Sequence, residues 1–314
     1  MWLVFAFVSA TIVGVRDFFK KTALQRSSML VVLCLVTVFS ALLFLPFIVV
    51  SRYTGWLDGT FFYVPEGNLL LHGCSLMKCV LLIACWLCSF DGIKHLPLTV
   101  SGMIAAFGPV ETALAAMLIY GESLSPMQWT GVLVSTASLV SICRGGSDEG
   151  HNGYLTNRHF WLMLLSTVFS AAAALWDKFA VGRPEDGGLG QSVMFIQSWY
   201  NIYQALILTA TLLYVRHRAN RKSPNETQDS VGFGAKTCLG VFLVSCCEVV
   251  ADLLYDAALQ LPGCLVSILA MARRGSVVVS FVLGAAFLHE TGLRRKAIDL
   301  VMVLLGMVLL CLGA

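Results

Sequence analysis

The chain has 314 residues, of which 58% are hydrophobic and only 12% are charged. Soluble domains contain about 25% charged residues, so the composition excludes an ordinary soluble protein and indicates a membrane protein with several spanning segments. The net charge of +3 is too small to indicate a nucleic-acid partner. The 11 cysteines lie mostly inside apolar runs, where cysteine behaves as a small apolar residue.

Apolar segments of membrane-spanning length follow one another along the chain. A spanning helix needs about 20 apolar residues, and the strict two-residue alternation of a membrane β-barrel is absent. We expect ten helices, at Trp2–Thr22, Met29–Val50, Leu69–Phe90, Pro97–Tyr120, Ser125–Cys143, His159–Val181, Gln191–Val215, Lys236–Leu259, Pro262–Leu288 and Arg294–Gly313. The polar, glycine-rich stretch 144–158 is the expected linker between a first part, residues 1–143, and a second part, residues 159–314.

The two parts contain similar patterns at corresponding places. Phe90–Pro97 begins with an aromatic residue and an aspartate and ends in Leu-Pro, and Tyr255–Pro262 does the same. Asp17 near the end of the first helix corresponds to Asp177 near the end of the sixth. Since five is an odd number, a second copy of five helices enters the membrane upside down. The sequence therefore predicts two inverted five-helix repeats, an architecture of secondary transporters that places the substrate site between the repeats.

This arrangement resembles the drug/metabolite transporter superfamily, and within it the EamA-type transporters of ten helices. The resemblance rests on the 5+5 layout, on the Leu-Pro opening of the fourth and ninth helices, and on the acidic residues Glu122 and Glu290 that close them. It implies that each half is an EamA-like repeat. The chain departs from the usual pattern at Asp299, where a glycine is common, and at the pair Arg273-Arg274, where small or apolar residues are usual.

The positive charges are distributed unevenly between the two sides of the expected bundle. Most Lys and Arg residues flank the connections after helices one, three, five, seven and nine, whereas the opposite side has only Arg52, Lys178 and Arg183. Positive residues favour cytoplasmic loops, so we expect both termini outside. The expected location is the plasma membrane, which in a bacterium is the inner membrane.

Charged residues inside the second half are the first candidates for a substrate or proton path. A charge at the centre of a spanning helix costs about 2.5–3.5 kcal/mol, and such residues commonly face a path through the bundle. Glu248, Asp252 and Tyr255 share one face of the eighth helix, and Arg273 and Arg274 lie near the middle of the ninth. We expect an Arg–carboxylate pair between these two neighbouring helices.

The first half reverses this polarity, with Lys78 on the third helix and Glu111 on the fourth. Two interpretations remain open: the ion pairs fix helix packing, or one carboxylate binds a proton and one arginine binds an anionic group. Trp199 and Tyr203 on the seventh helix form either an interfacial belt or a wall for an organic solute. Anchors or gate pairs at helix ends are expected at Arg16, Asp17, Trp176, Asp177 and Lys178.

The leading hypothesis is a secondary active transporter, a permease or exporter, for a small organic metabolite or drug-like solute. It would work by alternating access, with the proton as the candidate coupling ion at Glu248, Asp252 or Glu111. The expected partners are the solute and the lipid bilayer. An intramembrane enzyme and a non-transporting scaffold are the alternatives. We expect no cofactor and no metal, because no helix contains a recognised His-Asp or His-Glu metal spacing and no GxSxG or phosphate-binding glycine loop occurs.

Overall fold

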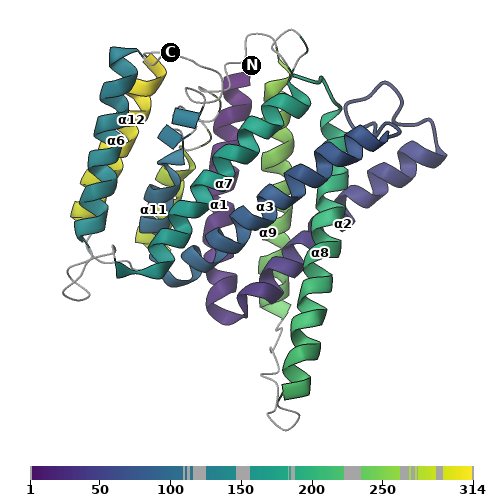
Figure 1. Ribbon diagram of the computed structural model, residues 1–314, viewed down its shortest axis with the longest axis horizontal. Helices are drawn as coiled ribbons and strands as arrows, with labels where there is room; N and C mark the ends of the chain where they lie inside the picture. Colours follow the sequence, from purple (N-terminus) through teal and green to yellow (C-terminus); the bar gives the residue numbers. More distant parts are fainter. Residues whose placement is uncertain are drawn as a thin grey trace.

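The computed structural model describes residues 2–108, 110–111, 114–115, 125–145, 156–182, 184, 188–222, 235–261, 269, 273, 275–287 and 293–312. Its regular elements within these ranges are ten α-helices (Figure 1). They are α1 (Trp2–Arg26), α2 (Met29–Tyr53), α3 (Leu69–His95), α4 (Leu98–Ala105), α6 (Pro126–Gly145), α7 (Arg158–Val181), α8 (Val193–Lys222), α9 (Ala235–Leu259), α11 (Ser276–Phe287) and α12 (Leu293–Leu312). In α2, α3, α7 and most of α9, the length and apolar composition suffice to span a membrane. The predicted helical membrane class is confirmed.

Several helices continue beyond their predicted ends. α1 extends to Arg26, α3 to His95 and α8 to Lys222, because a helix can leave the hydrocarbon and continue with polar residues. α3 ends just before Pro97, since proline disfavours helical backbone in the residue that precedes it. The predicted helices Pro97–Tyr120 and Pro262–Leu288 lie partly outside the described residues.

A buried lysine satisfies the end of α3. The Lys21 ammonium on α1 donates to the carbonyl oxygens of Ile93 at 2.6 Å, Lys94 at 3.1 Å and Leu96 at 2.5 Å. The last carbonyls of a helix have no partner within the helix and carry partial negative charge. Lys21 therefore fixes α1 to the C-terminal end of α3.

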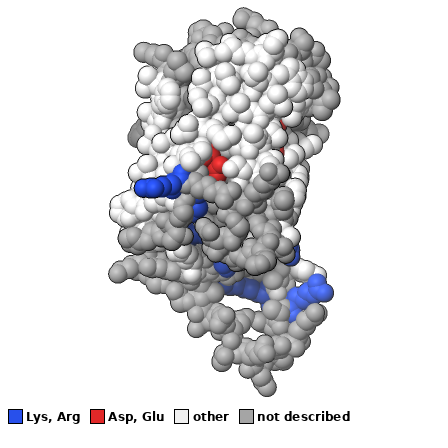
Figure 2. All heavy atoms as spheres, turned by 90° about the vertical axis from the view of Figure 1, so that its left-hand side faces the viewer, with Lys and Arg blue, Asp and Glu red and all other residues white. Residues whose placement is uncertain are grey.

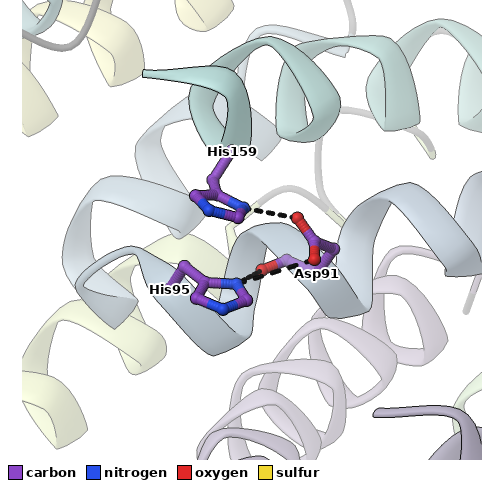
Figure 3. A group of neighbouring side chains, drawn as sticks. All are labelled: Asp91, His95 and His159. Atoms are coloured by element: carbon purple, nitrogen blue, oxygen red, sulfur yellow. Dashed lines mark hydrogen bonds and ion pairs between the residues drawn. The ribbon is translucent and has the colours of Figure 1, made fainter.

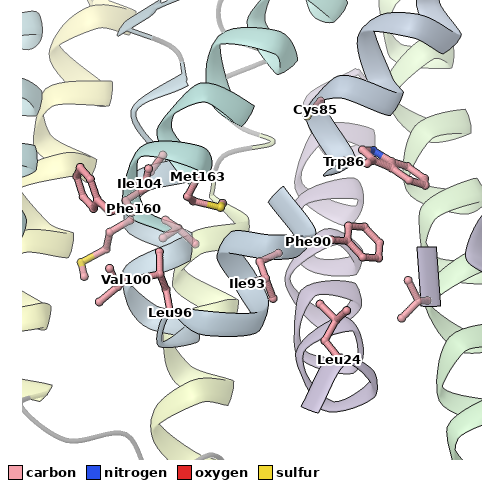
Figure 4. Close-up of a cluster of buried hydrophobic side chains, with 14 of the residues drawn as sticks. Leu24, Cys85, Trp86, Phe90, Ile93, Leu96, Val100, Ile104, Phe160 and Met163 are labelled. Atoms are coloured by element: carbon pink, nitrogen blue, oxygen red, sulfur yellow. The ribbon is translucent and has the colours of Figure 1, made fainter. Parts of the chain in front are cut away.

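The main helix contacts join the part of the chain before residue 144 to the part after residue 158. α1 packs against α9, α3 against α7, α2 against α8, α6 against α12 and α4 against α11. One cluster of buried apolar side chains includes residues from all ten described helices. Figure 4 shows part of it, where Ile93 of α3, Val100 of α4 and Met163 of α7 lie close together. Among the described residues, neither part has a buried apolar core separate from the other.

Close approach of helices depends on glycine at a few positions. A Cβ atom at Gly306 of α12 would lie 2.9 Å from the carbonyl oxygen of Gly131 on α6. Nearby, the Ser138 hydroxyl donates to the carbonyl oxygen of Asp299 at 2.8 Å. The aspartate at position 299 thus does not prevent α12 from packing closely, because Gly306 provides the small residue about two turns further along.

The exterior of the bundle is suited to lipid. Large aliphatic side chains such as Leu42, Leu133 and Val301 are more than half exposed. Figure 2 shows the side formed by α6 and α12, where the upper part is almost free of described charges and the visible Lys and Arg residues lie from mid-height downwards. Both described ends of the chain, at α1 and α12, lie at the opposite, upper end of the bundle (Figure 1).

Candidate functional site

A cavity of about 170 Å³ lies inside the bundle. Its walls come from α1, α3, α4, α7, α8, α9 and α11, so both parts of the chain contribute. Charged side chains from several helices line it: Arg16, Asp17, Lys20, Lys78, Asp177, Glu248, Asp252, Asp256 and Arg273. The cavity is the candidate site, since charge inside an apolar bundle is costly unless it is paired or functional.

Arg16 joins α1 to α9 at this cavity. Its guanidinium donates to Asp17 Oδ1 from Nη2 at 2.7 Å and from Nε at 3.0 Å, and Nη1 donates to Glu248 Oε2 at 2.8 Å. The expectation that Arg16 and Asp17 lie at a helix end is wrong, because α1 continues to Arg26 and carries both residues into the bundle. Their role as a gate pair remains a prediction.

The predicted pair between the eighth and ninth apolar segments is present. Arg273 Nη2 donates to Asp252 Oδ1, and the Tyr200 hydroxyl donates to Asp252 Oδ2 at 3.2 Å. The Arg273 guanidinium also lies 4.6 Å from the centre of the Tyr255 ring, a distance at which a cation is attracted to the ring face. Arg274 lies outside the described residues.

Lys78 is held by carboxylates of the other half. Its ammonium lies 2.8 Å from Asp177 Oδ1 on α7 and 3.5 Å from Asp256 Oδ2 on α9, and Gln197 donates to the same Asp256 oxygen at 2.5 Å. The expected opposite-sense pair of Lys78 with Glu111 is therefore wrong. Because α3 packs against α7, the nearest carboxylates to Lys78 come from the second half of the chain.

The remaining predicted site residues lie away from the cavity lining. Glu111 accepts a hydrogen bond from the Thr167 hydroxyl at 2.9 Å. Tyr203 bonds through its hydroxyl to His72 Nδ1 at 2.7 Å, and the Trp199 ring meets the same histidine edge to face. Trp176 Nε1 donates to the carbonyl oxygen of Cys74 at 3.0 Å, and Lys178, like these residues, is absent from the described lining of the cavity. The contacts of Glu111, Tyr203, Trp199 and Trp176 tie helices together, and none of the five residues is in the described lining of the cavity.

Lys20 lines the cavity, whereas from the sequence it counts among the positive residues that flank the connection after the first helix. Its side chain is nearly buried, with 3% of the residue exposed. Its ammonium lies 4.1 Å from the centre of the Phe90 ring and 4.0 Å from Asp17 Oδ1. Within the described part of the chain it makes no hydrogen bond, whereas neighbouring Lys21 makes three. The one feature of the sequence that could have indicated this position is a first helix long enough to continue past Lys20, which places the lysine within the bundle and not in a loop.

Comparison with known proteins identifies the class. Residues 1–144 match the model of the EamA-like transporter family. A solved structure titled "Crystal structure of protein" superposes with a TM-score of 0.58 at 16% identity, covering 97% of each chain; this likeness shows the fold over nearly the whole length. No curated protein matches the sequence.

The apolar helices and the family match define a multi-pass membrane transporter. Residues 1–144 are similar to the EamA-like transporter family, which is part of the drug/metabolite transporter superfamily. The resemblance predicted from the sequence is thereby confirmed, and the family described is one of transporters and not of enzymes.

Proposed function

We propose that the protein is a secondary transporter that carries a small organic solute with an anionic group through the central cavity by alternating access. The observation that carries this proposal is the single ammonium, that of Lys20, which faces the cavity without a hydrogen bond in the described part of the chain. The other charged lining residues are paired with one another.

The helix pairing supports two inverted repeats that move against each other. In the repeat, α1 corresponds to α7, and α3 corresponds to α9. The contact of α1 with α9 therefore has an equivalent in the contact of α7 with α3, and both contacts are observed. The ion pairs Arg16–Glu248 and Lys78–Asp177 both cross between the halves. A rocking motion around the cavity would break and re-form pairs of this kind, as in other transporters built from inverted repeats.

The choice of an anionic group follows from the pairing of the cavity charges. Each of the five lining carboxylates lies against Arg16, Lys78 or Arg273, so none is left for a cationic solute. Lys20 has only a distant carboxylate and an aromatic face. A buried donor without a hydrogen bond is costly, and the carboxylate or phosphate of a solute would remove that cost. The buried Ser101 hydroxyl, which lines the same cavity and has no hydrogen-bond partner among the described residues, offers a second donor.

The charge of the cavity supports proton coupling in the same direction as the solute. The described lining has four positive and five negative side chains, which leaves one negative charge. An anion entering alone would increase this imbalance, whereas an anion entering with one proton leaves it unchanged. We place the proton on Asp177 or Asp256, because these two carboxylates share the single cation Lys78.

Transport by the purified protein in liposomes tests the proposal. Pools of carboxylic acids and of phosphorylated metabolites are compared with pools of neutral sugars and cationic dyes, with and without a pH gradient. We expect saturable uptake from an anionic pool and stimulation by an inward proton gradient. Lys20→Gln removes one hydrogen bond to a charged group, worth about 1.5–3 kcal/mol, and should raise KM about 10- to 150-fold. Lys94→Gln, outside the cavity lining, is the matched control, and Lys20→Arg should restore part of the affinity.

Two results would contradict the proposal in different ways. No saturable flux of any pool by protein that elutes as a single folded species would refute transport. Flux of neutral or cationic solutes only, or an unchanged KM in Lys20→Gln, would refute the anionic group at Lys20 and leave transport itself standing.

A further inference from the structure

We propose that Asp91, His95 and His159 form a binding site for a divalent transition-metal ion, with Zn²⁺ as the ion to test. The three side chains meet where the last turn of α3 lies beside the first turn of α7 (Figure 3). One ligand atom from each residue lies within 4.8 Å of the other two. The site is separate from the central cavity, whose described lining includes none of the three.

The three ligands come from two helices and converge on one point. Asp91 and His95 are four residues apart on α3, so they share a helix face. His159 Nδ1 lies 2.5 Å from Asp91 Oδ2, and His95 Nδ1 lies 3.6 Å from Asp91 Oδ1. The two imidazole rings are stacked, with their centres 3.9 Å apart and their planes 18° from parallel. The Asp91 carboxylate thus faces both rings, through Oδ2 towards His159 and through Oδ1 towards His95.

The hydrogen bond of His95 prepares it as a ligand. Its Nδ1 donates to the carbonyl oxygen of Asp91 at 2.9 Å, which leaves Nε2 as the free ring nitrogen. Histidines that bind metals almost always donate their other ring N–H to a carbonyl or carboxylate, and this bond fixes the tautomer and the ring orientation. His159 is positioned by its backbone, because its N–H donates to the side chain of the helix cap Asn157 at 2.9 Å.

The chemistry and accessibility of the group suit zinc. Imidazole nitrogen and carboxylate oxygen bind Zn²⁺ at about 2.0–2.2 Å, so ligand atoms around a tetrahedral ion are on the order of 3.3 Å apart. The ligand atoms lie within 4.8 Å of one another, so the three side chains would have to move closer together around the ion. The side chains are 41% exposed at His95, 31% at His159 and 23% at Asp91. An ion can therefore enter from solvent, and water can complete its coordination.

A metal ion here would clamp two halves of the bundle. α3 belongs to the part of the chain before residue 144 and α7 to the part after residue 158, and their contact is close. A Cβ atom at Gly92, next to Asp91, would lie 2.9 Å from Met163 Cβ. Zinc at this end would hold α3 and α7 together and slow any motion that separates them. This effect on transport rests on the proposed function, whereas the binding of the metal does not.

Metal binding is measured on the full-length protein in detergent, after removal of any histidine tag and treatment with a chelator. Equilibrium dialysis against Zn²⁺, with the bound metal determined by mass spectrometry, gives the affinity. We expect one tightly bound ion per chain in the wild type. Asp91→Asn, His95→Gln and His159→Gln should each weaken binding by at least about tenfold, the lower end of the loss seen even for residues that only support metal ligands. His217→Gln, an exposed histidine on α8, should bind as the wild type does.

The variants also distinguish zinc bound at Asp91, His95 and His159 from zinc bound elsewhere on the protein. His95 is exposed at a helix end, so His95→Gln is expected to fold normally and keeps the test valid if His159→Gln does not. A wild type without bound zinc, or a His95→Gln variant that binds it equally well, would overturn the proposal. Zinc should further slow transport in the wild type but not in His95→Gln. Tight binding without this difference would refute the clamp, and absence of transport in zinc-free wild-type protein would count against the proposed function instead.

Discussion

Replacing Lys78 tests how the buried charges of the cavity are balanced. Only 2% of this residue is exposed, and its ammonium lies 2.8 Å from an oxygen of Asp177 and 3.5 Å from an oxygen of Asp256. Lys78→Met keeps most of the volume but leaves two buried carboxylates without their shared cation. Removing one partner of a buried ion pair costs about 3–5 kcal/mol, and here two carboxylates lose theirs. We therefore expect the free energy of unfolding to fall by the upper part of this range, about 4–5 kcal/mol.

A second substitution distinguishes lost charge balance from lost packing. Asp256→Asn in the Lys78→Met background removes one uncompensated charge while an amide oxygen still accepts from Gln197, so about half of the lost stability should return. Unfolding in mixed micelles with increasing SDS, followed by circular dichroism, measures these differences. Arg52→Met is the control, because Arg52 and Glu66 form an exposed pair with side chains 59% and 79% accessible, and such pairs contribute at most about 1 kcal/mol. A Lys78→Met protein as stable as the Arg52→Met control, or a double variant less stable than Lys78→Met, would refute the reasoning.

Two further predictions concern packing and orientation. Gly14→Ala should lower the free energy of unfolding by about 1–3 kcal/mol through overpacking, because the added Cβ would lie 2.8 Å from Val279 Cγ1 of α11. The control is Gly73→Ala in α3, which has open space around it and should be neutral or stabilising by up to about 1 kcal/mol. Equal effects of the two variants in the same SDS titration would contradict the contact between α1 and α11. The distribution of positive charges predicts that the α8–α9 connection lies in the cytoplasm. In intact cells expressing a variant without other reactive cysteines, Ser223→Cys should therefore resist a membrane-impermeant thiol reagent, and Asp58→Cys should react. The reverse pattern would show that the termini face inwards.

The sequence was sufficient for the helices and for contacts between helices that are neighbours in the chain. Apolar runs of bilayer length predict spanning helices because the backbone has no other way to satisfy its hydrogen bonds in lipid. The pair Asp252–Arg273 could be predicted for a similar reason, since only a short turn separates the two helices expected from the sequence, Lys236–Leu259 and Pro262–Leu288. Both predictions depend only on residues that are close together in the sequence.

Contacts between the halves were not accessible from sequence in this way. Lys78 was assigned to Glu111 because both lie in the first half, but α3 packs against α7 and brings Asp177 to the lysine instead. The Asp91–His95 spacing was overlooked because the third helix was expected to end at Phe90, and it becomes a shared helix face only when α3 extends to His95. Helix ends that carry polar residues and packing between distant helices both depend on the assembled bundle.

The pairing of α1 with α9 also bears on how the chain is made. Arg16 and Glu248, which bond to each other, are 232 positions apart. At synthesis rates of about 5–20 residues per second, roughly 10–50 s separate their emergence from the ribosome. During that interval Arg16 has its neighbour Asp17 but lacks its partner on α9, and a charge inserted deep in lipid is costly. α1 therefore reaches its final, buried environment only after α9 has entered the membrane.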